Sequence, residues 1–511
     1  MGNDLWKLTA ANITDGIASK SFSASEVVRS HLQHIEKVNP KVNAIVTLDE
    51  EFANLQANEV DKRVKDGKEL RPLEGVPIGI KDTTAVKGIR TTHGSKFFEH
   101  HVPDTDDIIV DRIKASGAII LGKTNTPEFA AGGNTFNDIF GATKNPWNLS
   151  LSAGGSTGGG AAGLAAGMFP LASGTDLGGS LRIPAAFCGV QGIRPTVGLV
   201  PVGPKNLPFQ SLGVSGPMAR NSHDLGVLLE VMAKPHHLDP LSPGFGFELT
   251  QEKNHKELKL AYVNDPVRIG IDNDVADKCQ KAVHDLANLG HKLEIIEIDF
   301  SEGREAFEIL RAQSMVNGFL DYVEKLDQMG ENIAGNIKRG LDQSSLDVAR
   351  AEVTRGELWK KLAAVFTTYD ALVTPTLPIT PFPFEENYPK KIDNKPTRSY
   401  IDWFSTTFVF SLFGVPALSV PAGLSNNKLP VGLQIIGPHF SENRLLRLAK
   451  NVEEIGAASI LVGGSSATDQ MEMAEVVKNL KSAVNIPIIL FPGNITGVVP
   501  QADAILFSSL M

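Results

Sequence analysis

The sequence has few cysteines, no long apolar run and no excess of basic residues. Two of its 511 residues are cysteines, too few for a disulfide framework, and no Cys-x-x-Cys pair indicates zinc. No stretch is apolar over the roughly 18 residues that a membrane helix needs, and the N-terminus lacks the basic start and apolar segment of a signal peptide. The net charge of −9 argues against a nucleic-acid-binding face. We therefore expect a cytoplasmic protein with no membrane partner and no direct nucleic-acid partner.

What the chain does contain is enough apolar material for a large core. Apolar residues make up 42% and charged residues 21% of it, which excludes global disorder. Helix and strand patterns alternate along the first part of the chain. Ser23 and Glu26 form a capping box before a helical repeat, and GVPIGI at 75–80 has the pattern of a buried strand that ends at Lys81. Such alternation is typical of an α/β architecture in which helices cover a sheet.

Glycine is densest between residues 154 and 203, where Ser156 and Ser180 each lie in a glycine cluster. Glycine lets a ligand approach the bare backbone, and successive backbone N–H groups can converge on an anion. Acyl transfer needs a nucleophile beside such donors, because its tetrahedral intermediate carries an oxyanion. The sequence DLGGS at 176–180 supplies both on one loop.

A serine hydroxyl is a weak nucleophile and needs a base. None of the 12 histidines lies in the glycine-rich segment 152–194. A lysine can serve instead where burial lowers its pKa, so that the amine is neutral near the working pH. Lys81 fits this role because it ends an apolar strand.

Three motifs, in this order, resemble those of the amidase signature family. They are GVPIGIKD at 75–82, GGSTGG at 154–159 and DLGGSLRIP at 176–184. The resemblance covers about residues 5–450. It implies an α/β amidase-signature fold, with a mixed central β-sheet covered by α-helices on both faces, and an amidase signature domain over 1–451.

The same resemblance implies a Ser-Ser-Lys triad that hydrolyses a carboxylic amide to a carboxylate and ammonia or an amine through an acyl-enzyme. Lys81 would be the base, Ser156 the bridging serine after a cis peptide bond, and Ser180 the nucleophile. The expected oxyanion donors are the backbone N–H groups of Leu177, Gly178, Gly179 and Ser180. The residues expected to scaffold the loops are Gly155, Thr157, Thr175, Asp176 and Arg182. No metal and no cofactor are implied; the expected partner is a small-molecule amide, and a homodimer stays open.

Other interpretations of these residues leave more unexplained. Ser156 also matches G-x-S-x-G, the nucleophile elbow of α/β-hydrolases, but that fold accounts for neither the lysine motif nor the second serine. No G-x-x-x-x-G-K-[ST] sequence indicates a phosphate loop. Lys123 in GKTNTPEF is expected to be structural. The remaining reactive side chains are expected to fill the core or to be solvated: Cys188, which could suggest a nitrilase-like thiol, Cys279, His236 and His237.

The resemblance fixes the reaction better than the substrate. One alternative is the amidase-type component of a glutamyl-tRNA(Gln)/aspartyl-tRNA(Asn) amidotransferase, its A subunit, which usually carries D-T-G-G-S-I-R-Q-P. This chain has Leu177 and Ile183 at two of those positions, which favours a free-standing amidase. A non-catalytic binding protein on the same fold is the other alternative. The walls of the substrate pocket are expected from helices within 300–366 and from the loop at 379–410.

The last part of the chain, residues 452–511, does not continue the amidase pattern. Strands are predicted at 458–462, 486–491 and 502–507, with a helix over about 468–483, which makes a partial βαβ, β/α-barrel-like C-terminal fragment. It resembles an internal piece of the geranylgeranylglyceryl phosphate synthase family, a (β/α)-barrel prenyltransferase. The strands expected to hold magnesium and most of the phosphate site are missing, so no activity is implied. We expect a fused segment whose removal leaves amide hydrolysis intact.

Overall fold

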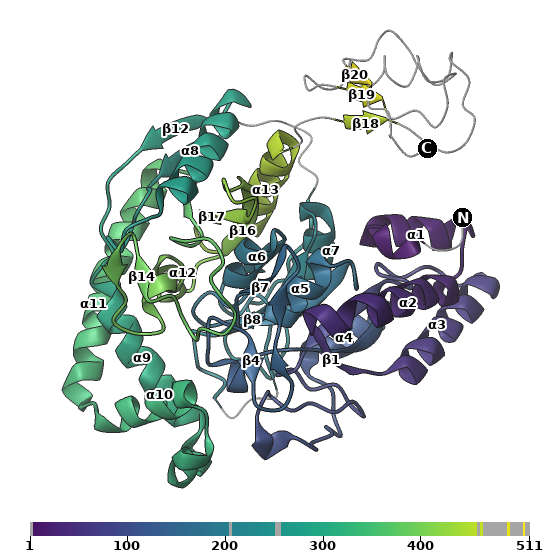
Figure 1. Cartoon of the computed structure of the whole chain (residues 1–511), viewed down its shortest axis with the longest axis horizontal. Coiled ribbons are helices and arrows are strands. Elements are labelled where there is room, and N and C mark those ends of the chain that lie inside the picture. The colour runs from purple at the N-terminus through teal and green to yellow at the C-terminus, as the bar shows by residue number, and fades with distance from the viewer. Residues whose placement is uncertain are drawn as a thin grey trace. The chain divides into compact units, whose positions relative to one another are not determined.

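The computed structural model describes residues 4–203, 207–250 and 257–456, together with the backbone of three short strands further on (Figure 1). The chain divides into two compact units, Met1–Val452 and Glu453–Met511. Within the described ranges, every helix is too short or too polar to cross a lipid bilayer.

An eleven-stranded mixed sheet forms the centre of the first unit. In spatial order its strands are β1 (Ile45–Leu48), β3 (Ile119–Thr124), β2 (Pro77–Lys81), β8 (Leu171–Asp176), β10 (Val214–Ala219), β9 (Gln191–Arg194), β16 (Ala417–Leu424), β17 (Pro430–Ile436), β13 (Ala371–Pro375), β11 (Lys259–Tyr262) and β12 (Lys292–Ile295). β2 runs parallel to both β3 and β8. The carboxyl ends of β2 and β8 therefore lie at one edge of the sheet, which is where α/β proteins place ligands.

Helices flank both faces of this sheet, so the expected mixed α/β architecture is confirmed (Figure 1). They are α1 (Ala10–Ala18), α2 (Ala24–Val42), α3 (Glu50–Lys65), α4 (Ile108–Ala115), α5 (Gly158–Ala165), α6 (Arg182–Cys188), α7 (Ser222–Met232), α8 (Asn273–Asn288), α9 (Gly303–Gly318), α10 (Glu331–Asp342), α11 (Ser345–Thr368), α12 (Ser405–Ser411) and α13 (Glu442–Gly456). The predicted capping box is present at the start of α2. The Ser23 hydroxyl accepts from the Glu26 amide at 3.1 Å, and the Glu26 carboxylate accepts from the Ser23 amide at 2.8 Å.

Helix α5 consists of glycine and alanine apart from one leucine, and it packs very closely against its surroundings. A Cβ at Gly159 would lie 2.3 Å from the backbone nitrogen of Asn125, and one at Gly163 would lie 2.2 Å from the ring of Phe169. Side chains at these positions would push the helix outward. The small residues therefore fix the place of the loop that comes immediately before α5, which carries Ser156.

The second unit contains three short parallel strands, β18 (Ile460–Val462), β19 (Ile488–Leu490) and β20 (Ala504–Ile505). Each lies within one of the three predicted strand ranges. The helix predicted over about 468–483 lies outside the described residues.

Removing the chain after Gly456 is expected to leave the first unit folded, because α13 ends there and its apolar residues are buried in the first unit's core: Leu445, Leu446, Leu448, Ala449 and Val452. We expect the thermal unfolding midpoint of the first unit to change by no more than about 2 °C, and amide hydrolysis to stay within about twofold. Differential scanning fluorimetry and a hydrolysis assay measure the two.

A second truncation, after Phe440, is the control. It removes α13 and exposes the surface that the helix covers, so it should lower the unfolding midpoint sharply. Loss of folding in the longer truncated chain as well would contradict an independent first unit.

Candidate active site

Strand β2 delivers Lys81 to a fully buried position surrounded by hydroxyl groups. Its Nζ lies 2.7 Å from Ser156 Oγ, 2.8 Å from Thr175 Oγ1 and 3.1 Å from Thr157 Oγ1. A neutral amine has two N–H donors and one lone pair, and a hydroxyl can donate as well as accept. An ammonium has three N–H donors, so three hydroxyls can surround the lysine in either its charged or its neutral form. The nearest of the three is the Ser156 hydroxyl.

Burial lowers the pKa of Lys81 from 10.5 to about 7, while the negative charge of Asp176 acts in the opposite direction. Near pH 7 a large fraction of this amine is thus unprotonated, as a base requires. Two of the residues expected to scaffold the loops, Thr157 and Thr175, contact the amine directly. Sequence reasoning did not foresee these contacts, because β8 and the residues before α5 are distant from β2 along the chain.

Ser156 follows a cis peptide bond with Gly155 and is almost completely buried. A Cβ at Gly155 would lie within about 3.1 Å of three backbone atoms in the segment 132–134. Only glycine fits such a close approach of two backbones.

Ser180 lies in the turn between β8 and α6, and Asp176 organises that turn. The Asp176 carboxylate accepts from the amide of Gly179 at 2.9 Å and from the amide of Leu181 at 3.2 Å. It also receives two hydrogen bonds from Arg182, at 2.9 and 3.0 Å, and lies 3.4 Å from Arg194. Burial alone would raise the pKa of Asp176, but the two guanidinium groups hold it at about 2. The carboxylate is therefore ionised at every working pH.

The backbone N–H groups of this turn were expected to be the oxyanion donors. No hydrogen bond among the described residues uses the N–H groups of Leu177, Gly178 or Ser180, whereas the Gly179 N–H is bound to Asp176. Of the four N–H groups expected as oxyanion donors, those of Leu177, Gly178 and Ser180 are therefore available, and that of Gly179 is not. Gly179 instead serves packing: a Cβ there would lie 2.2 Å from Thr407 Oγ1, and its φ of +124° suits glycine.

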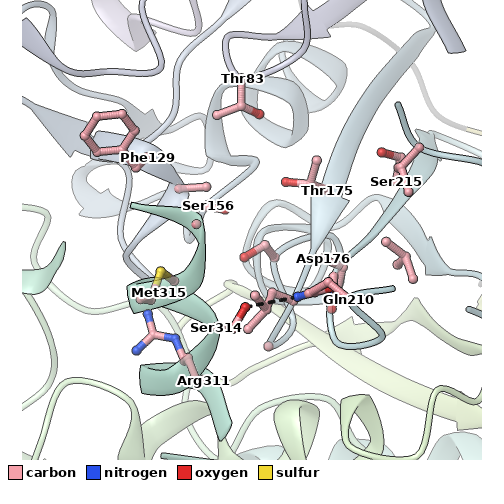
Figure 2. A pocket seen from close by; sticks show the side chains of 18 of the residues that line it. Thr83, Phe129, Ser156, Thr175, Asp176, Gln210, Ser215, Arg311, Ser314 and Met315 are labelled. Carbon is pink, nitrogen blue, oxygen red and sulfur yellow. Dashed lines mark hydrogen bonds between the residues drawn. The ribbon is translucent and has the colours of Figure 1, made fainter. Parts of the chain in front are cut away.

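A cavity of about 540 Å³ opens onto these groups, and Ser156 and Ser180 both line it. No hydrogen bond joins their hydroxyls among the described residues; such bonds often tighten only when substrate binds. Figure 2 shows Arg311, Ser314 and Met315 projecting from α9 beside the cavity that Thr175 and Ser156 also line.

Part of the cavity wall comes from the expected regions, namely α9 and Phe404 in the short turn Asp402–Phe404. Other parts of the wall were not foreseen. They include Asp107, Thr83 and Thr84 after β2, residues 129–132, and the segment around Gln210, whose amide nitrogen lies 3.3 Å from Ser314 Oγ (Figure 2). These residues are on irregular connections, which carry no periodic signal.

The other reactive side chains considered from the sequence, a lysine, two cysteines and two histidines, lie outside this cavity. Lys123 Nζ donates to the Thr84 carbonyl and, at 2.7 Å, to the Thr91 hydroxyl. Burial raises the thiol pKa of Cys188 and of Cys279, and both thiols donate to backbone carbonyls. The rings of His236 and His237 stack on each other in a loop. Across the part of the chain that the structure describes, no cluster of three or more His, Cys, Asp or Glu side chains could hold a metal ion.

Replacing Asp176 by asparagine should destabilise the protein, because it leaves Arg182 and Arg194 as buried charges without a counter-ion. Breaking a buried ion pair in this way costs about 3–5 kcal/mol. We expect urea unfolding to show this lower unfolding free energy. Turnover should fall as well, because the asparagine side chain has one acceptor oxygen where the carboxylate has two, and so holds the Ser180 turn with fewer hydrogen bonds. The partly exposed Asp347, in the capping box of α11, provides the control, since Asp347→Asn should change the unfolding free energy little. Equal stabilities of the two variants would contradict the role of Asp176.

Comparison with known proteins agrees with this geometry. The amidase family model matches residues 26–446, and the PcrB family model matches residues 441–511. An acylamidase of Rhodococcus erythropolis is 35% identical over 460 residues, covering 88% of this chain and 95% of the relative. The A subunit of the glutamyl-tRNA(Gln) amidotransferase from Alkaliphilus metalliredigens is 33% identical over 478 residues, covering 88% and 96%.

Among solved structures, a bacterial aryl acylamidase of the amidase signature enzymes superposes with a TM-score of 0.83 at 27% identity, covering 88% of this chain and 96% of that one. The 6-aminohexanoate cyclic dimer hydrolase superposes with a TM-score of 0.78 at 26% identity, covering 89% and 98%. The matched family model spans most of the chain and includes all three motifs. The chain therefore belongs to the amidase family and is a hydrolase that acts on amide C–N bonds.

Proposed function

We propose that the chain is a free-standing amidase that works through Lys81, Ser156 and Ser180. The observation that carries this proposal is the 2.7 Å contact between Ser156 Oγ and a buried amine with a pKa of about 7. The contact lies on a cavity that the Ser180 hydroxyl also lines, next to the backbone N–H groups of the Ser180 turn.

In the first half of the reaction, the lone pair of Lys81 takes a proton from Ser156, which takes one from Ser180. The Ser180 oxygen then attacks the amide carbon and forms a C–O bond. The N–H groups of Leu177, Gly178 and Ser180 stabilise the negative oxygen of the tetrahedral intermediate. Return of the proton through Ser156 to the amide nitrogen lets the C–N bond break and the amine leave.

In the second half, water attacks the acyl-enzyme, and the same relay accepts its proton. The ester bond to Ser180 breaks, the carboxylate is released and the Ser180 hydroxyl is restored. No group outside the chain, the substrate and water is consumed.

Sequence identity does not separate an amidase from an amidotransferase component, since relatives of both kinds match equally well. The cavity does favour one of them. Leu177 and Ile183, which replace the threonine and glutamine of the usual amidotransferase motif, both line it. An apolar wall at these two places suits a substrate with an apolar portion.

The test is release of amine from a panel of aliphatic and aryl amides by the purified chain alone. Turnover without a second subunit or tRNA supports the proposal. Activity that requires glutamine, charged tRNA and co-purifying partner subunits would support the amidotransferase alternative. No release from any amide, by a folded protein, would indicate a binding protein.

A further inference from the structure

Arg311 is a buried cation in the cavity wall, and no acidic side chain among the described residues pairs with it. It lies on α9, is 5% exposed and lines the same cavity as Ser180. Among the described residues that line the cavity, it is the one lysine, arginine or histidine.

The carboxylates nearest along the fold are engaged elsewhere. Glu308, one turn earlier on α9, lies 3.2 Å from Arg304 and 3.6 Å from Arg339. Asp402 lies 2.5 Å from Arg304. Burial raises the pKa of Glu308, and the charges of Arg339 and, less strongly, Arg311 act in the opposite direction. Within the described part of the chain, Arg304 and Arg339 thus form ion pairs with acids, whereas Arg311 interacts with Glu308 only at longer range.

Two residues nevertheless fix the orientation of Arg311. Its Nη1 donates to Asn336 Oδ1 at 2.6 Å, and its guanidinium carbon lies 5.2 Å from the centre of the Tyr400 ring. Asn336 in turn donates to the Tyr400 hydroxyl at 2.6 Å. This arrangement holds one side of the guanidinium group, and the cation–π contact holds its plane.

A buried charge without a counter-ion is costly, and a guanidinium group held in one orientation has the fork geometry that binds a carboxylate with two hydrogen bonds. We propose that the substrate carries a carboxylate besides the scissile amide, and that Arg311 binds this carboxylate while Ser180 attacks the amide. This inference rests on the proposed function, since it names the substrate class of the same site.

Asp107 and Asp176 also line the cavity, and Asp176 is paired with Arg182 and Arg194. The apolar part of the wall fits such a molecule. Leu177, Ile183 and Phe404 provide apolar surface in the same cavity. A short apolar chain between the carboxylate and the amide would contact these side chains. The volume of about 540 Å³ is within the range of small-ligand sites.

Two substrates that differ in one charge test the proposal. They are the mono-4-nitroanilide of glutaric acid and the 4-nitroanilide of its monomethyl ester. The wild type should prefer the carboxylate by about 10–100-fold in kcat/KM, mostly through KM, as a charge-assisted pair implies. Arg311→Met should abolish this preference, so that the two substrates have equal kcat/KM, and circular dichroism checks separately that the variant is folded. Arg311→Lys, which keeps the charge without the fork, should be intermediate.

Arg339→Met is the matched control, because Arg339 lies on the neighbouring helix α10, is half exposed and does not line the cavity. It should retain the preference. Equal kcat/KM for the two substrates in the wild type, or an equal loss on both in Arg311→Met, would overturn the role of Arg311 while leaving the proposed amidase activity standing.

Inhibition by free glutarate shows whether Arg311 binds a carboxylate in the active-site cavity or elsewhere. It should inhibit ester hydrolysis competitively in the wild type and should have little effect on Arg311→Met. Arg311 also borders a smaller polar pocket of about 240 Å³, and non-competitive inhibition would place the anion there and contradict the proposal. If neither anilide is hydrolysed, the proposed function fails. Calorimetric binding of glutarate that Arg311→Met abolishes would then still support the carboxylate site.

Discussion

Ser180→Ala is expected to lower kcat for amide hydrolysis by on the order of 10³-fold or more, because this change removes the hydroxyl that lies beside the backbone N–H groups of the turn. Ser180 lines the cavity, but the hydrogen bonds and ion pairs of Asp176 do not involve its side chain, so the variant should fold and bind substrate. Steady-state kinetics on one chromogenic anilide, with substrate binding measured by calorimetry, gives both quantities.

Ser314→Ala is a suitable control for this experiment. Ser314 also lines the cavity, but its hydroxyl contacts Gln210 and not the amine of Lys81. It should change kcat by less than about tenfold. Retention of most activity in Ser180→Ala would contradict the assignment of the nucleophile.

Lys81→Met should cause a loss comparable to that of Ser180→Ala, because in the proposed mechanism the amine is the final proton acceptor for both serines. The two changes act on one unit, so the double variant should be barely slower than either single variant. A loss in the double variant equal to the product of the single losses would contradict a shared relay.

The kcat/KM of the wild type should rise with pH as Lys81 loses its proton. Below its pKa of about 7 the amine is protonated and cannot accept a proton, so kcat/KM should fall about tenfold per pH unit. Above it the amine is neutral and the rate should reach a plateau. The pKa of Asp176, at about 2, is too low for this residue to contribute between pH 5 and 9. A flat profile over that range would exclude Lys81 as the base.

Lys123→Met is the control for Lys81, since it also removes a fully buried lysine, from the neighbouring strand β3. Lys123 lies 4.0 Å from Asp82 and forms no hydrogen bond with Ser156 or Ser180. Its loss should lower the unfolding temperature and leave the pH profile of the remaining activity centred near 7. Movement of that midpoint would indicate that Lys123 takes part in proton transfer.

Local motifs predicted much of the centre of this fold. The buried strand before Lys81 and the capping box at Ser23 were readable, because a strand's apolar run and a helix's first turn are set by neighbouring residues. The neighbouring strand β3, Ile119–Thr124, includes the buried Lys123. Its charge is satisfied by the Thr84 carbonyl and the Thr91 hydroxyl, and no local pattern reveals such contacts.

The candidate site shows the same division. The motifs identified Lys81, Ser156 and Ser180 as candidates. They could not show that the hydroxyls of Thr157 and Thr175 also form hydrogen bonds with the Lys81 amine. They also could not show that Gly179 gives its N–H to Asp176. Arg311 belongs to no motif, and its place in the cavity wall matters because Glu308 on α9 and Asp402 form their ion pairs with other arginines. Properties of this kind arise only from tertiary packing.

The most direct measurement is the reaction of the intact chain with a fluorophosphonate probe, followed by mass spectrometry of the protein and its peptides over a range of pH. We predict one adduct, on Ser180, with a labelling rate that rises to a plateau with a midpoint near pH 7 and is nearly lost in Lys81→Met. An adduct on another residue, or labelling of Ser180 at a rate independent of both pH and Lys81, would contradict proton transfer from Ser180 through Ser156 to a neutral lysine.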